Sequence, residues 1–124
     1  MTAAPRKYSR FADDRARDEL DRLLVSRDSP LHYQAAMTEL GRQLGTIVCA
    51  AIPLPAKCLV ASTAEDADFL SKGVMESLGH SHEVLAAVFW NNHYSIPGGS
   101  IAPVVHQYLQ PGFESVDWHN HFCV

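Results

Sequence analysis

The sequence predicts a small three-layer α/β domain, in which an N-terminal helical pair precedes a β-α-β-α-β unit with a parallel sheet. Two long segments with apolar residues at helical spacing come first along the chain. Short apolar runs then alternate with further helical segments, and one of these runs is apolar throughout, as expected of a central strand covered on both faces. A strand, a helix and a strand in this order form a βαβ unit with a right-handed crossover.

The length of the chain suits one domain. It has 124 residues, of which 47% are hydrophobic, enough to build a core and to argue against global disorder. We expect a single domain over 1–124, with a flexible arm at 1–10, the helical pair at 11–52 and the α/β unit at 57–124.

Two helices are expected before the sheet. The spacing of apolar residues predicts helices over 12–25 and 30–51, and the second ends before Pro53. Gly41 and Gly45 lie four residues apart in the second helix and could allow another helix to approach closely. This long helix is also a plausible surface for self-association, so we expect a homo-dimer.

The α/β unit is expected to contain three strands and two helices. A Ser-Thr pair followed three residues later by acids resembles a capping box at the start of the first of these helices, and a left-handed glycine cap at Gly79 is expected to end it. In chain order we predict a strand at 57–61, a helix from 63 to 79, a strand at 84–90, a loop at 91–100, a helix at 101–109 and a strand at 114–118.

Polar residues follow two of these strands at the point where each strand ends. If the strands are parallel, their carboxyl ends meet at one rim, where open α/β sheets bind ligands. The predicted ligand-binding residues are Ser62 and Thr63 after the first strand, and Asn91, Asn92 and His93 after the second. A helix start at Ser62 could attract an anion, but acids in the same turn favour simple capping.

A second candidate lies near the end of the chain. His119, His121 and Cys123 alternate, so in a strand they would share one face. Imidazole and thiolate ligands suit zinc, with a fourth ligand left open between His80, His82, His93 and Asp117. The other interpretation is a polar strand end whose histidines face solvent, with no cofactor. Gly79–His82 is expected to form a surface turn, and Cys49 and Cys58 to fill the core.

Charge patterning disfavours two classes of partner. The formal net charge is −4, and seven of the ten Lys and Arg residues fall within 1–30. Nucleic acid is therefore an unlikely partner, because a duplex-binding face needs clustered basic residues. The chain has no apolar run long enough for a membrane span, and its start lacks the apolar stretch of a signal peptide, so a cytoplasmic location is expected.

Part of the sequence resembles a known family. The segments that carry the resemblance are Cys58-Leu-Val-Ala-Ser-Thr-Ala-Glu-Asp-Ala-Asp-Phe-Leu, Val84–Asn91, and Ile101-Ala-Pro-Val-Val with Tyr108. Through them, residues 57–112 resemble the middle of phosphoribosyltransferase-like α/β domains. The resemblance implies a shortened or degenerate member. The family's acidic strand end and its Thr- and Gly-rich phosphate loop have no counterpart, so no catalytic residue is carried over.

The sequence contains no nucleophile elbow, P-loop or dinucleotide-binding motif. We therefore expect a non-catalytic binding module, an inhibitor or adaptor that takes a protein partner or a small polar ligand at the carboxyl rim of the sheet. The alternative is an enzyme. It would be either a degenerate nucleotide- or phosphoribosyl-handling transferase, or a metal-assisted hydrolase that uses the C-terminal His/Cys cluster.

Overall fold

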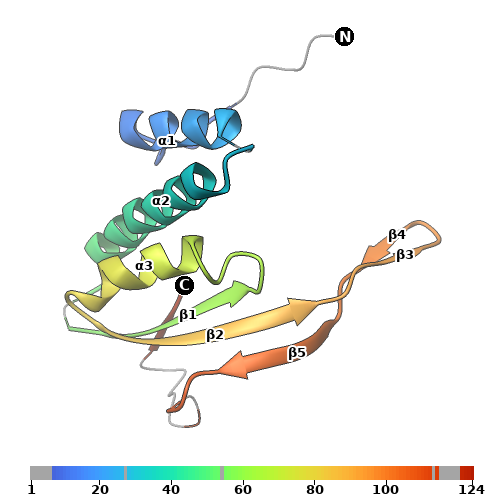
Figure 1. The fold of residues 1–124 in the computed structure, drawn as a ribbon. Coiled ribbons are helices and arrows are strands. Elements are labelled where there is room, and N and C mark those ends of the chain that lie inside the picture. The colour runs from blue at the N-terminus through green and yellow to red at the C-terminus, as the bar shows by residue number, and fades with distance from the viewer. Residues whose placement is uncertain (1–6, 27, 54, 113, 115–120) are drawn as a thin grey trace.

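Helices and a mixed sheet form the body of the protein, and a two-stranded arm extends from it (Figure 1). The computed structural model describes residues 7–26, 28–53, 55–112, 114 and 121–124. The helices are α1 (Asp14–Val25), α2 (Pro30–Ala51) and α3 (Leu70–Gly79). The strands are β1 (Lys57–Thr63), β2 (Glu83–Asn91), β3 (Tyr94–Ile96), β4 (Gly99–Ile101), β5 (Val104–Leu109) and β6 (His121–Cys123). The predicted α/β class is confirmed, whereas the all-parallel sheet is not.

The four-stranded sheet has the order β5-β2-β1-β6. β1 runs parallel to β2, with a register from Lys57 opposite Glu83 to Thr63 opposite Phe89, so the predicted β1-α3-β2 unit is present. β6 is also parallel to β1, whereas β5 is antiparallel to β2. The sheet is therefore mixed. All three described helices lie on one side of it in Figure 1, so a helix layer on each face is not confirmed.

The prediction of a helix over 101–109 is wrong. This segment contains the end of β4 and all of β5, which pairs with β2 from Ala87 to Asn91. Two adjacent β-branched residues, Val104 and Val105, favour an extended backbone. As a strand, the segment also provides hydrogen-bond partners for the backbone groups along one edge of β2. The predicted loop at 91–100 instead forms most of the β3–β4 hairpin. Of the predicted strand at 114–118, residues 115–118 lie outside the described residues.

Glycines bring α2 and α3 into direct backbone contact, as the spacing of Gly41 and Gly45 suggested. A Cβ atom on Gly41 would overlap the carbonyl oxygen of Leu70, and one on Gly45 would lie 2.7 Å from the carbonyl oxygen of Val74. Gly73 on α3 is packed equally closely against α2. Only residues without a side chain allow this separation, so these glycines set the distance between the two helices.

The core lies where α3 covers β1. Cys58 and Val60 of β1 pack with Val74 and Leu78 of α3, and all four are at most 3% exposed. Side chains around this cluster come from the end of α2, from α3, from β2 and from the last residue of the chain: Val48, Cys49, Ile52, Met75, Val84 and Val124. The same packing fixes the orientation of β1, because Cys58 and Val60 must face α3.

Helix ends agree with the sequence only in part. Asp13 caps α1 by accepting a hydrogen bond from the backbone N–H of Ala16 at 2.8 Å. α3 ends at Gly79 as predicted, but without a left-handed glycine. Within the described part of the chain, positive φ angles occur at Gly98 and Gly112. No described helix is both long and apolar enough to cross a membrane.

Candidate functional site

The carboxyl ends of β1 and β2 meet at one rim, as predicted. The two strands point the same way (Figure 1), and the backbone N–H of Ala64 donates to the carbonyl of Phe89 at 2.9 Å. This bond holds the chain leaving β1 against the end of β2. Three of the five predicted ligand-binding residues, Thr63, Asn91 and His93, line the same cleft at this rim.

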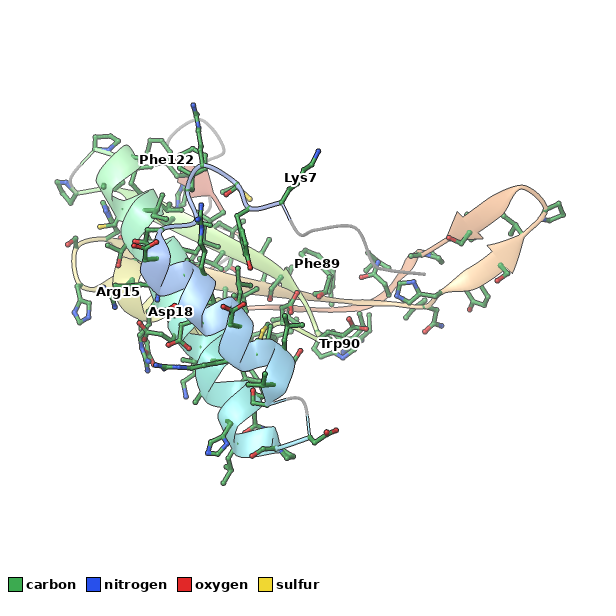
Figure 2. The ribbon with its side chains drawn as sticks, turned by 90° about the horizontal axis from the view of Figure 1, so that it is seen from above. Lys7, Arg15, Asp18, Phe89, Trp90 and Phe122 are labelled. Carbon is green, nitrogen blue, oxygen red and sulfur yellow. The ribbon has the colours of Figure 1, made fainter. Side chains whose placement is uncertain are left out.

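The cleft has a volume of about 380 Å³ and a largely apolar lining. Phe89 and Trp90 point to opposite sides of β2 (Figure 2), and both contribute to its wall. The remaining lining residues are Ala64, Glu65 and Ala102, with Thr63, Asn91 and His93 as above. A site of this composition suits an apolar group with one or two hydrogen-bonding atoms.

Much of the hydrogen-bonding capacity of the rim is already used within the chain. The side-chain amide of Asn91 donates to the carbonyl of Ala102 at 2.8 Å, and that of Asn92 donates to the Tyr94 hydroxyl at 3.2 Å. The Thr63 hydroxyl lies 3.5 Å from a carboxylate oxygen of Asp66, a marginal contact. The two asparagine amides therefore position the arm.

Ser62 does not line the cleft. Residues alternate along β1, so Ser62 shares the α3-facing side with Cys58 and Val60. Its hydroxyl is buried and makes no hydrogen bond to any of the residues that the structure describes. The prediction that Ser62 contacts a ligand is therefore not supported by its position.

The helix start expected at Ser62 and Thr63 lies further along the chain. α3 begins at Leu70, and its N-cap residue Phe69 provides no side-chain hydrogen bond. Turns connect β1 to α3 and carry Glu65, Asp66 and Asp68. The positive end of the helix dipole is thus distant from Thr63, and the acids that precede it would repel an anion. This geometry removes the basis for an anion site at Thr63.

The C-terminal cluster lies elsewhere on the sheet. His121 pairs with Lys57 at the amino end of β1, and Cys123 pairs with Leu59. Neither residue therefore lies at the carboxyl rim of β1 and β2. His119 falls outside the described residues. Among the residues that the structure does describe, no group of three or more His, Cys, Asp or Glu side chains could hold a metal ion.

A buried cysteine–histidine contact was not anticipated from the sequence. His82, expected in a surface turn, is only 7% exposed. Its Nδ1 accepts a hydrogen bond from the backbone N–H of Ala56 at 3.0 Å, and its Nε2 lies 3.4 Å from the sulfur of Cys49. A backbone amide can only donate, so the ring proton is on Nε2 and points to the sulfur. His82 therefore cannot take the proton of Cys49 in this arrangement.

Cys58, next to this contact in the core, is equally unsuited to nucleophilic chemistry. Burial, with a smaller contribution from neighbouring Cys49, raises the pKa of its thiol, which keeps it protonated. The three groups therefore stabilise the junction between α2, β1 and β2, and the arrangement does not resemble an activated thiol.

No family model matches this chain, and no significant match was found among curated proteins or solved structures. The resemblance of residues 57–112 to phosphoribosyltransferase-like domains therefore stays a prediction.

Proposed function

We propose that this chain is a non-catalytic binding module that engages another protein through its carboxyl rim and the adjoining β3–β4 arm. The observation that carries the proposal is the exposure of the arm. All six residues of β3 and β4 are exposed, and the large side chains among them, Tyr94, Ile96 and Ile101, are 49%, 44% and 48% accessible. The arm extends away from the helices and the sheet in both views (Figures 1 and 2).

An arm of this kind has little stability of its own. A two-stranded ribbon in water is at best marginal, and it gains stability when another surface covers it. Three large apolar side chains on such a ribbon are unfavourable in water. Their burial against another surface would stabilise the complex by roughly 25 cal/mol per Å² of apolar area. We therefore infer that the side chains of Tyr94, Ile96 and Ile101 contact a partner protein.

The charge pattern suggests the chemistry of that partner. Residues 84–112, which contain most of β2 together with the arm and β5, include no Asp, Glu, Lys or Arg, although the chain has 24 such residues in total. Charged groups of a partner would find no counter-ion along these strands and would lose hydration on contact. The partner surface that meets the arm is therefore apolar and uncharged, with backbone groups or small polar side chains, whereas Glu65 of the adjoining cleft lies outside this stretch.

The cleft beside the arm offers a place for an anchoring side chain. Its walls at Phe89 and Trp90 are apolar, and His93, an exposed residue of the lining, could hydrogen-bond to a polar tip. At about 380 Å³, the cleft accommodates one large side chain of a partner. A small polar ligand in the same cleft is the alternative use. It is less favoured because the side-chain amide of Asn91 already donates to Ala102.

Two experiments test the proposal. A photo-crosslinking amino acid at position 96 should capture a protein in lysate of the source cells, whereas the same amino acid at the exposed position 25 of α1 should not. A thermal-shift screen with nucleotides and sugar phosphates tests the alternative, because a ligand that binds only the folded state raises the melting temperature. If a small molecule raises the melting temperature and no protein is crosslinked, the site binds a small ligand and the partner-protein proposal is wrong.

A further inference from the structure

The outer edge of β5 lacks a partner among the described residues. β5 is the last strand in the order β5-β2-β1-β6, and β2 occupies its inner edge. An open strand edge presents unpaired backbone N–H and C=O groups, and the best complement for such a row is another extended backbone. The hydrogen-bonding geometry therefore identifies the occupant of this edge as a β-strand.

The backbone bonds show which residues of β5 point outward. The N–H of Gln110 donates to the carbonyl of Ala86 at 3.0 Å, so Gln110 faces β2. The register is regular from His106 to Leu109, and the bulge lies beyond it at Trp90/Asn91. In an antiparallel pair, alternate residues face the neighbouring strand. His106 and Tyr108 therefore direct their backbone groups toward β2, while Gln107 and Leu109 direct theirs away from the sheet.

Most of the devices that protect an edge strand are absent from β5. Natural edge strands are shielded by lysine, by internal proline, by inward-pointing charge, by extreme shortness or by a β-bulge, and of these β5 has only the register shift near Val105. β5 has six residues and contains no Lys, Pro, Asp, Glu or Arg. It also exposes large side chains: Val104 and Val105 are each 53% accessible and Tyr108 is 49% accessible. Such an edge is open to pairing with another strand.

We propose that β5 pairs antiparallel with β5 of a second copy of this chain, about a two-fold axis at Gln107, so that one sheet continues through both copies. In this register Gln107 lies opposite the same residue of the other copy, and the outward N–H and C=O groups at 107 meet each other in a closely spaced pair. His106 then lies opposite Tyr108 of the other copy. The tilted ring pair of Trp90 and His106, with centroids 5.1 Å apart, thereby gains an aromatic neighbour.

Charge favours a second copy as the occupant. The chain carries a net charge of −4, so most approaches of two copies are repulsive. β5 lies wholly within the uncharged stretch 84–112, and so does its neighbour β2 apart from Glu83, so pairing of two β5 edges brings no acids of β5 together. The pairing does not depend on the partner-binding proposal, because it uses the edge of β5 and leaves the β3–β4 arm exposed.

Sedimentation analysis of the full chain between about 1 and about 100 µM tests the proposal. We expect a concentration-dependent dimer. Gln107→Pro should yield a monomer over the same range, since proline removes an outward N–H and leaves the bonds between β5 and β2 in place. Gln107→Ala is the matched control and should dimerise like the wild type. A monomeric wild type, or a dimer that Gln107→Pro leaves intact, would overturn the proposal.

Amide hydrogen exchange on the wild-type chain gives a second readout that does not require a variant to fold. In the dimer, the amides of Gln107 and Leu109 should exchange as slowly as those of His106 and Tyr108, which bond to β2. After dilution to the monomer, the amides of Gln107 and Leu109 should exchange rapidly, while those of His106 and Tyr108 should stay protected. If the amides of Gln107 and Leu109 exchange rapidly at concentrations where the chain is dimeric, the interface lies on another surface. In that case the β5 pairing is wrong.

Discussion

The sulfur of Cys49 lies 3.4 Å from Nε2 of His82, a residue 33 positions further along the chain. Cys49 is close to the end of α2, and His82 directly precedes β2. The other ring nitrogen of His82, Nδ1, accepts a hydrogen bond from the backbone N–H of Ala56, just before β1. One imidazole thus joins three segments that the sequence separates, at the amino end of the two central strands.

Removal of this imidazole should destabilise the fold. His82→Ala leaves the N–H of Ala56 without its acceptor in a partly buried position and opens a cavity where the buried imidazole was, and we expect a loss of about 2–4 kcal/mol in the free energy of unfolding. Urea denaturation measures it. His80→Ala, two residues away and exposed, is the control and should change stability by less than about 0.5 kcal/mol. Equal effects of the two variants would contradict the role assigned to His82.

The close contact of α2 and α3 predicts opposite outcomes for two glycine-to-alanine variants. Gly41→Ala should destabilise the protein by about 3 kcal/mol or more, because its Cβ would overlap the backbone of Leu70. Gly79→Ala should be neutral or stabilising by about 0.5–1 kcal/mol, since its Cβ meets nothing within 4 Å and alanine favours a helix. Thermal unfolding of both variants checks the pair. A tolerated Gly41→Ala would mean that the helices are further apart.

The buried hydroxyl of Ser62 provides a third test. Because it makes no hydrogen bond, Ser62→Ala should leave stability unchanged or raise it by about 1 kcal/mol. Ser77→Ala is the control, since that hydroxyl donates to the carbonyl of Arg42 at 2.8 Å and its loss should cost about 1 kcal/mol. Chemical denaturation should therefore show a loss of stability for Ser77→Ala and none for Ser62→Ala. A clear loss on Ser62→Ala would show that this hydroxyl has a partner.

Acid should weaken the contact between α2 and α3. Arg42 lies 2.7 Å from a carboxylate oxygen of Glu76, and this hydrogen bond lowers the pKa of Glu76 below its ordinary value of 4.5. A carboxyl group with a depressed folded pKa stabilises the fold above its unfolded pKa, and this contribution is lost as the pH falls through the folded pKa. The stability difference between wild type and Glu76→Gln should therefore be larger at pH 7 than at pH 3. A difference that does not change with pH would contradict the ion pair.

The rim is predictable from the sequence because short apolar runs that end in polar residues indicate parallel strands of a βαβ unit. Parallel pairing of β1 and β2 brings Thr63, Asn91 and His93 together. For the segment at 101–109 the local pattern indicates the wrong element. Its apolar residues Ile101, Val104, Val105 and Tyr108 follow helical spacing, although their β-branched character favoured a strand.

Other features depend on tertiary contacts that no local pattern encodes. The edge of the sheet that β6 joins, and its register with His121 opposite Lys57, follow from packing of distant segments. The burial of His82 likewise depends on Cys49 and on the backbone of Ala56. The sequence offered one usable signal for the β3–β4 hairpin, the Pro97-Gly98-Gly99 turn, in which Gly98 adopts a positive φ of 84°.

Crosslinking from the arm tests the central claim most directly. With a photo-reactive residue at position 96, we expect irradiation to yield a discrete covalent adduct with another protein, identified by mass spectrometry. The adduct should be lost when Tyr94 and Ile101 are changed to serine, and kept when the exposed Leu31 of α2 is changed instead. No adduct from position 96, or one that survives the loss of both apolar neighbours, would contradict a partner-binding arm.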